Sequence, residues 1–162
     1  MVHIIIMNIV YRKAAVVDVD MLVEMRMSML SEMHEPAEAL ARVLRNNTRE
    51  YFLTALEDGS FSMFVALHDN RIVAMGGISY FRFPPNDWAY MGNTAYISNM
   101  FTLREYRKNG FATVILSMIM EEATRKGTER IILNPTETGR ALYEKHGFKE
   151  WSGAMAFFPK SP

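Results

Sequence analysis

Residues 104–116, REYRKNGFATVIL, combine positive charge, a turn and the start of an apolar helix pattern. Arg107 and Lys108 come just before Asn109 and Gly110, two residue types that tolerate the backbone angles of a tight turn. The first N–H groups of a helix have no acceptor within the helix and carry partial positive charge, so they bind anions readily. A glycine also lets an anion approach the backbone closely. The segment therefore predicts a turn that binds a phosphate group at the start of a helix.

The elements around this turn can be predicted from hydrophobic spacing and turn residues. Helical spacing or strand-like runs indicate, in order, a strand at 8–12, helices at 21–33 and 37–56, strands at 61–67, 72–81 and 95–102, a helix at 111–126, a strand at 130–133, a helix at 138–146 and strands at 148–151 and 154–158. Asp69-Asn70 suits a two-residue hairpin turn, and Gly76-Gly77 indicates a bulge or a close approach of backbone.

This order predicts one mixed α/β domain over residues 1–162. Its sheet is expected to be mostly antiparallel, with about six to seven strands and about four flanking helices. The connection from strand 95–102 through the helix to strand 130–133 should be a right-handed parallel crossover.

The composition excludes several classes of protein. The chain has 162 residues, 49% hydrophobic and 22% charged, which is typical of a folded domain. Eighteen basic residues balance 18 acidic ones, so nucleic acid is not expected as a ligand. There is no cysteine, and the four histidines show no metal-ligand spacing, so no metal site is expected. No run approaches the ~20 apolar residues of a membrane span, and no signal peptide is evident. A cytoplasmic location fits these features.

Two motifs resemble those of the GNAT superfamily of N-acetyltransferases. Arg107-x-x-Gly110-x-Ala112 matches the family's acyl-CoA signature, Arg/Gln-x-x-Gly-x-Gly/Ala, and it follows a strand and opens a helix. About thirty residues later, ALYEKHGF at 141–148 is similar to the family's Leu-Tyr-Glu-x-x-Gly-Phe segment. The dinucleotide fingerprint and the nucleotide loop ending in Gly-Lys-Ser/Thr are absent. The order of elements agrees with the family's fold, so the resemblance covers nearly the whole chain.

The resemblance implies a site for acetyl-CoA where the sheet splays apart. The cofactor's arm would pair with strand 95–102, a backbone N–H near Asn99 or Met100 would polarise the thioester carbonyl, and Tyr143 would be the general acid. The residues that the resemblance places at the cofactor are Met100, Phe101, Thr102, Arg107, Lys108, Asn109, Gly110, Phe111, Ala112, Thr113, Asn134 and Arg140.

The implied reaction is acetyl transfer to a primary amine of a small molecule or peptide by direct attack. Many relatives carry a glutamate on the fourth strand, whereas residues 96–99 here are Tyr-Ile-Ser-Asn. This departure keeps open a non-catalytic acyl-CoA-binding module. A partner-binding domain without a small-molecule ligand and an acyl group longer than acetyl also stay open. Relatives often dimerise, so a homodimer is a further possibility.

Single residues also have alternative interpretations. Tyr143 could be a core tyrosine bonded to backbone, and Asn99 could be a strand-bulge residue without a ligand role. Met25 and Met29 could fill the core or line an apolar acceptor pocket. The missing base would have to be replaced by a water chain, or by a carboxylate or histidine of another element, with Glu32, His34, Glu35 and Asp87 as candidates.

Overall fold

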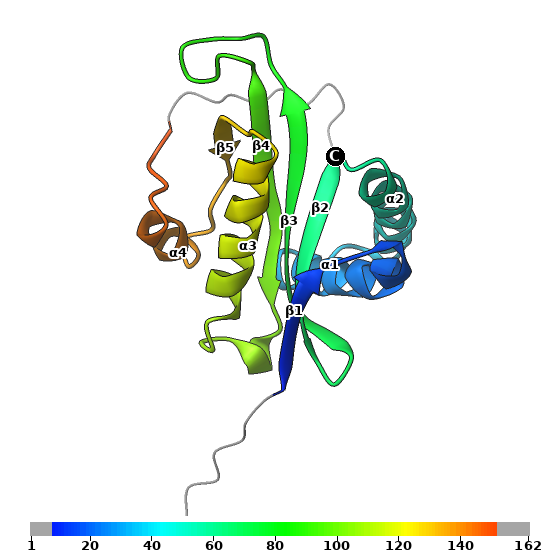
Figure 1. Ribbon diagram of the computed structural model, residues 1–162. Coiled ribbons are helices and arrows are strands. Elements are labelled where there is room, and N and C mark those ends of the chain that lie inside the picture. The colour runs from blue at the N-terminus through cyan, green and yellow to red at the C-terminus, as the bar shows by residue number, and fades with distance from the viewer. Residues whose placement is uncertain (1–7, 152–162) are drawn as a thin grey trace, which may run out of the picture.

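The computed structural model describes residues 8–151, and its helices and strands follow the predicted order (Figure 1). The chain begins with β1 (Ile9–Lys13), and α1 (Val19–Met33) and α2 (Glu38–Glu57) come next. The middle forms β2 (Phe61–His68), β3 (Arg71–Arg82) and β4 (Asn93–Thr102). After β4 come α3 (Phe111–Arg125), β5 (Arg130–Ile132) and α4 (Arg140–Lys145). Short 3-10 helices, Val16–Asp18 and Arg104–Tyr106, precede α1 and α3. Among the helices of residues 8–151, none is both long and apolar enough to cross a membrane.

The five strands of the described residues form one sheet in the order β1-β2-β3-β4-β5. The first four are antiparallel to their neighbours, and β5 is parallel to β4, so α3 is the crossover between them. Asp69 and Asn70 both have positive φ, 49° and 62°, which fits the predicted two-residue hairpin turn. The predicted class, a mixed α/β fold with a mostly antiparallel sheet and flanking helices, is confirmed.

The predicted number of six to seven strands is too high for the described residues, because residues 148–151 form no strand. Gly147 has φ 85° and the Phe148 N–H donates to the Tyr143 carbonyl (3.1 Å), so this segment begins by closing the end of α4. Trp151 then packs edge-to-face on Trp88, with ring centroids 4.9 Å apart. The other strand predicted there, residues 154–158, lies outside the described residues.

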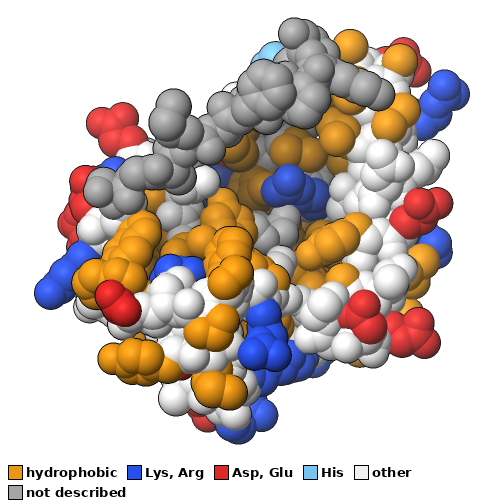
Figure 2. All heavy atoms as spheres, turned by 90° about the horizontal axis from the view of Figure 1, so that it is seen from above, with side chains coloured by type: hydrophobic (Ala, Val, Ile, Leu, Met, Phe, Trp, Pro, Cys, Tyr) orange, Lys and Arg blue, Asp and Glu red, His pale blue; other side chains and the backbone are white. Residues whose placement is uncertain are grey.

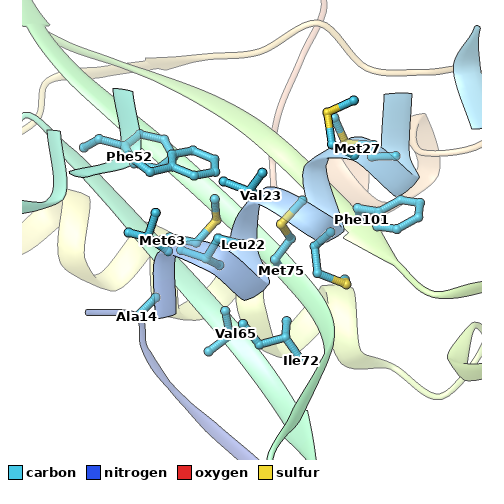
Figure 3. Packing of buried hydrophobic residues seen from close by; sticks show 14 of the residues in the cluster. Ala14, Leu22, Val23, Met27, Phe52, Met63, Val65, Ile72, Met75 and Phe101 are labelled. Carbon is cyan, nitrogen blue, oxygen red and sulfur yellow. The ribbon is translucent and has the colours of Figure 1, made fainter. Parts of the chain in front are cut away.

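The sheet separates two hydrophobic clusters. On one face α1 and α2 cover residues such as Met63 and Met75 (Figure 3). On the other face α3 crosses over β3 and β4 and buries Ile115 (Figure 1). Met25 and Met29 are only 5% and 9% exposed and belong to the first cluster, which favours the core interpretation of these methionines.

A buried carboxylate joins α3 to three strands. Glu122 is 4% exposed and accepts hydrogen bonds from Lys13 Nζ (3.0 Å), Ser62 Oγ (2.5 Å) and Tyr80 OH (3.2 Å). Burial by itself would raise the pKa of Glu122, but the bonds from Ser62 and Lys13 and the charges of Lys13 and Lys126 bring it below the ordinary value. The C-terminal half of α3 is therefore fixed to β1, β2 and β3 by an ionised side chain.

We expect Glu122→Gln to lower the free energy of unfolding by about 2 kcal/mol at neutral pH, because Lys13 loses its counter-charge. Since the pKa of Glu122 is lowered by folding, its contribution is complete above the ordinary glutamate pKa of about 4.3 and is lost as pH falls through the folded value. Urea unfolding at pH 7.5 and near pH 4 measures both effects, with Glu121→Gln on the exposed side of α3 as control. A destabilisation that does not shrink toward pH 4 would contradict this account.

Candidate functional site

β4 has a strand partner on only one side for much of its length. It pairs with β5 only through Thr94, Ala95 and Tyr96, whereas its pairing with β3 continues to Thr102. Within residues 8–151, the β5-side edge of β4 beyond Tyr96 therefore has no neighbouring strand. Such an edge presents N–H and C=O groups that can pair with an extended ligand.

A bulge lies in this part of β4. Ser98 pairs with Gly77 and Phe101 with Met75, so Asn99 and Met100 together oppose Gly76. A Cβ on Gly76 would lie 2.3 Å from Met100 Sδ and 2.6 Å from Ile115 Cγ2, distances that a side chain cannot occupy. The absence of a side chain at this glycine allows Met100 to pack against α3 at the bulge.

Asn99 has the unusual backbone of the bulge and an unpaired buried atom. Its φ is 57°, in the left-handed region where asparagine is several-fold enriched over most residues. Its Nδ2 donates to Ser98 Oγ (3.0 Å), while its buried Oδ1 has no hydrogen-bond partner among the described residues. The bulge interpretation of Asn99 therefore fits its backbone, and its carboxamide oxygen is free to accept a hydrogen bond.

The turn before α3 presents a row of N–H groups. The N–H groups of Thr113 and Val114 donate to the Gly110 carbonyl (3.0 and 3.3 Å). The N–H groups of residues 108–112 donate to no acceptor within the described chain. Lys108 and Gly110 have φ 64° and 80°, and nothing lies within 4 Å of the position where a Cβ on Gly110 would stand. The geometry is that of an anion-binding helix start.

Side chains at the ends of the turn fix its shape. Arg107 donates through Nε to the Thr102 carbonyl (3.0 Å) and through its guanidinium to Glu32 of α1 (2.6 Å), and it lies over the Phe101 ring. Asn109 Nδ2 donates to the carbonyls of Tyr106 and Arg107 (3.0 and 3.1 Å). The guanidinium of Arg107 is thus engaged in holding the turn against β4 and α1, and Lys108 is the exposed cation beside the N–H row.

Several predicted contact residues have side chains that pack into the core or face water. Phe101 and Phe111 are 9% and 5% exposed, and Met100 packs against the α3 cluster. Thr113 is exposed on the first turn of α3. Contacts of the three core residues with a ligand would therefore come from their backbone.

Tyr143, Asn134 and Arg140 line a cavity of about 1230 Å³ beside β5, together with Tyr96 and Phe148. Tyr143 is 9% exposed, and no side-chain hydrogen bond of its phenol occurs within residues 8–151. Burial, and secondarily the nearby Tyr96, raise the pKa of Tyr143. Its phenol is therefore protonated at neutral pH and able to donate. Arg140 instead pairs with Glu150 (2.6 Å).

Residues 21–148, most of the chain, match the family model described as the Acetyltransferase (GNAT) family. The chain belongs to this GNAT acetyltransferase family. Acetyl-CoA is the acyl donor of the family, and the chain carries the family's mixed α/β fold.

Solved structures agree with this assignment. This GNAT protein is similar to a predicted acetyltransferase of Clostridium acetobutylicum, whose crystal structure was determined with acetyl-CoA: identity is 29%, coverage is 93% of this chain and 96% of that one, and the TM-score is 0.82. A GCN5-related N-acetyltransferase of Ralstonia eutropha has the same fold, with 19% identity, 94% and 100% coverage and a TM-score of 0.83. So does glucosamine-6-phosphate N-acetyltransferase of Arabidopsis thaliana, with 14% identity, 94% and 99% coverage and a TM-score of 0.69. No curated protein matches the sequence.

Sequence reasoning missed two features of the site in this GNAT protein. Tyr96 lies near Tyr143 and lines the same cavity. The alternation of side chains along the predicted strand could have indicated on which face of the sheet Tyr96 lies. Glu32, considered as a base, is the partner of Arg107, and no local signal connects residues so far apart in sequence.

We expect Asn99→Ala to lower the free energy of unfolding by about 1 kcal/mol, because alanine is strained at positive φ. Asn99→Gly should cost less, since glycine adopts this backbone freely. Urea unfolding of both variants measures the difference. Equal destabilisation by the two variants would mean that the left-handed backbone of the bulge is not what residue 99 provides.

Proposed function

We propose that this GNAT protein transfers an acetyl group from acetyl-CoA to a primary amine of a small molecule or peptide by direct attack. The observation that carries the proposal is the row of N–H groups at residues 108–112, next to the edge of β4 beyond Tyr96; neither has a hydrogen-bonding partner on that side among residues 8–151. Acetyl-CoA has a diphosphate and an amide-containing arm, and these two features of the chain suit the two parts of the molecule.

The turn fits a diphosphate for three reasons. Its N–H groups have no competing acceptor in the described chain. No atom of the described residues outside the turn itself lies within 4 Å of the position that a Cβ on Gly110 would take, so an oxygen can reach the backbone there. Lys108 is exposed beside the row and forms no salt bridge with a carboxylate of residues 8–151, so its charge is available to a phosphate. Arg107 and Asn109 would act by holding the turn in this shape.

The edge of β4 would bind the arm as an added strand, with backbone groups of Met100, Phe101 and Thr102 as partners. When bound, acetyl-CoA supplies an activated acetyl thioester. A backbone N–H at the bulge, from Asn99 or Met100, would donate to the thioester carbonyl oxygen and stabilise the charge that develops on it.

As the C–N bond forms and the C–S bond breaks, Tyr143 would donate its phenolic proton to the departing sulfur. The attacking nitrogen would give up one proton to solvent, and Tyr143 would regain a proton from solvent. Its raised pKa suits an acid that must stay protonated. Asn134 lines the same cavity and would help position the reacting groups. The amine would attack in its neutral form. β4 carries no carboxylate and Glu32 is paired with Arg107, so neither is expected to be the base that takes the amine's proton.

We expect Gly110→Leu to weaken acetyl-CoA binding at least tenfold, because the side chain would occupy the space that an oxygen needs to reach the N–H row. Gly127→Leu is the matched control, since Gly127 at the other end of α3 also has positive φ (69°) and free space around it. Both variants should lose about 1–2 kcal/mol of stability from backbone strain. Isothermal titration with acetyl-CoA, alongside urea unfolding, separates the two effects. If both variants weaken binding equally, the turn is not the diphosphate site.

We expect Tyr143→Phe to lower kcat by roughly 10²–10⁴-fold with unchanged acetyl-CoA affinity, because the departing sulfur loses its proton donor. Because the pKa of Tyr143 is raised above about 10, any alkaline loss of activity due to this phenol should lie above that pH in the wild type and be absent in the variant. Thiol release from acetyl-CoA with a panel of amines measures the rate across pH.

Tyr96→Phe is the control, since it removes a second hydroxyl from the same cavity. An unchanged turnover in Tyr143→Phe would reject the general-acid role. Saturable acetyl-CoA binding without thiol release for any amine would instead favour the non-catalytic module.

A further inference from the structure

Tyr106 is the last residue of the 3-10 helix Arg104–Tyr106 and stands just before the turn that precedes α3. Its ring is partly buried against the α3 cluster, with its centroid 6.3 Å from that of Phe111, the first residue of α3. Its carbonyl accepts the hydrogen bond from Asn109 Nδ2 (3.0 Å). Tyr106 therefore joins the beginning of the turn both to the asparagine within it and to the helix after it.

The hydroxyl of Tyr106 is held by a residue from another part of the sheet. His68 Nδ1 lies 2.9 Å from the Tyr106 hydroxyl oxygen, at hydrogen-bond distance, and the two rings meet edge-to-face with centroids 5.6 Å apart. Asp69 Oδ2 is 3.7 Å from the other ring nitrogen of His68, Nε2. A carboxylate there favours the tautomer with its proton on Nε2, so the Tyr106 phenol donates and Nδ1 accepts.

His68 is itself fixed by the sheet. It is the last residue of β2 and is paired with Ile9 of β1 and with Arg71 of β3. The tight turn Asp69-Asn70 follows at once, and 25% of the His68 side chain is exposed. Figure 1 shows the β2–β3 hairpin and the turn before α3 at the same end of the sheet. The imidazole is therefore a fixed group to which Tyr106 is bonded.

A second contact between the hairpin and the 3-10 helix is weaker. Arg71 and Glu105 lie 3.9 Å apart, and both side chains are more than half exposed, so this ion pair contributes little. Within residues 8–151, the bond between His68 and Tyr106 is thus the stronger side-chain link between the hairpin and the residues before the turn.

We propose that His68 is a positioning residue for acetyl-CoA, and that it acts through Tyr106 to hold the turn in the shape that binds the diphosphate. The inference rests on the proposed diphosphate site at residues 108–112. The pair of Arg107 and Glu32 holds the turn from the α1 side of the sheet, and the bond between His68 and Tyr106 holds it from the α3 side. Since N–H groups that are already aligned bind an anion best, this bond strengthens diphosphate binding without His68 contacting the cofactor.

The experiment compares two acyl donors, one with the diphosphate and one without it. S-acetylpantetheine has the thioester and the amide-containing arm of acetyl-CoA, but neither the diphosphate nor the nucleotide. Acetyl-CoA binding is measured by isothermal titration and S-acetylpantetheine binding by ¹⁵N amide shifts. The proteins are wild type, His68→Leu, Tyr106→Phe, the double variant of these two, and His68→Asn. Asparagine places an amide atom where His68 has Nδ1, so it can still bond the phenol.

Tyr90→Phe is the matched control, because it removes an exposed phenol hydroxyl from the β3–β4 connection. This connection lies at the opposite end of the sheet from the hairpin (Figure 1). Figure 2 views that opposite end, where hydrophobic side chains lie at the surface. Urea unfolding of every variant confirms that each is folded under the conditions of the titrations.

We expect His68→Leu and Tyr106→Phe each to weaken acetyl-CoA binding roughly threefold to tenfold, because the turn is then less ordered before the cofactor binds. The double variant should bind no more weakly than the more affected single variant, since both changes remove the same hydrogen bond. His68→Asn should recover most of the affinity, and Tyr90→Phe should match wild type. Affinity for S-acetylpantetheine, and kcat at saturating acetyl-CoA, should be unchanged in all variants.

Equal weakening of both donors would mean that the substitutions disturb the fold as a whole, and this result would overturn the proposal. Wild-type affinity for acetyl-CoA in both single variants would also overturn it. So would losses that add in the double variant, because His68 and Tyr106 would then act independently.

Two comparisons separate this inference from the proposed function. If Gly110→Leu weakens acetyl-CoA binding and the His68 and Tyr106 variants do not, the diphosphate site is supported and the positioning role is rejected. If the variants lose affinity for acetyl-CoA but not for S-acetylpantetheine, while wild type releases no thiol with any amine, the positioning role is supported and the acetyl transfer is rejected.

Discussion

The loss of β5 as a partner of β4 after Tyr96 is the constraint on which the rest of the site depends. A continuous ladder would satisfy every backbone group of β4 and leave no edge for a ligand. The bulge at Asn99 and Met100 adds an extra residue opposite Gly76, and bulges increase local twist. Asn99 has a left-handed backbone at this bulge, and Gly76 opposite it leaves room for the Met100 side chain, so residues on two neighbouring strands contribute to one geometry.

The turn before α3 needs a rigid helix behind it, because free N–H groups bind an anion well only when they are already aligned. Two interactions at opposite ends of α3 provide this rigidity. Glu122 fixes the C-terminal half to β1, β2 and β3, and Arg107 joins the turn to Thr102 and Glu32. The second interaction also links the turn to α1. A shift of α1 would therefore displace the turn and its row of N–H groups.

Local signals in the sequence were enough for much of the fold and for part of the site. The hairpin turn at Asp69-Asn70, the close approach at Gly76 and the start of α3 after Gly110 each depend on residues adjacent in sequence, and each was predicted. Features that depend on partners distant in sequence were not predicted. From the sequence alone, Glu122 is indistinguishable from an exposed glutamate on a helix. Its partners Lys13, Ser62 and Tyr80 come from three distant strands. Arg107 was expected to add charge at the turn, but Glu32, 75 residues away, directs its guanidinium to α1. The strand predicted at 148–151 was wrong because its first residue closes α4.

The turn before α3, the bulge of β4 and β5 contribute different groups to the site. The α3 face supplies backbone N–H groups and almost no side-chain charge at the turn besides Lys108. Arg130 of β5 donates to the Thr94 hydroxyl, and its buried Nε has no partner among residues 8–151. An acyl donor held along the edge of β4 would place its thioester carbonyl at the bulge, where an amine would add to the carbonyl carbon from one face of the carbonyl plane. Because Asn99 Oδ1 has no partner among residues 8–151, an N–H of the acceptor would satisfy it on binding, so the same residue would shape the strand and orient the amine.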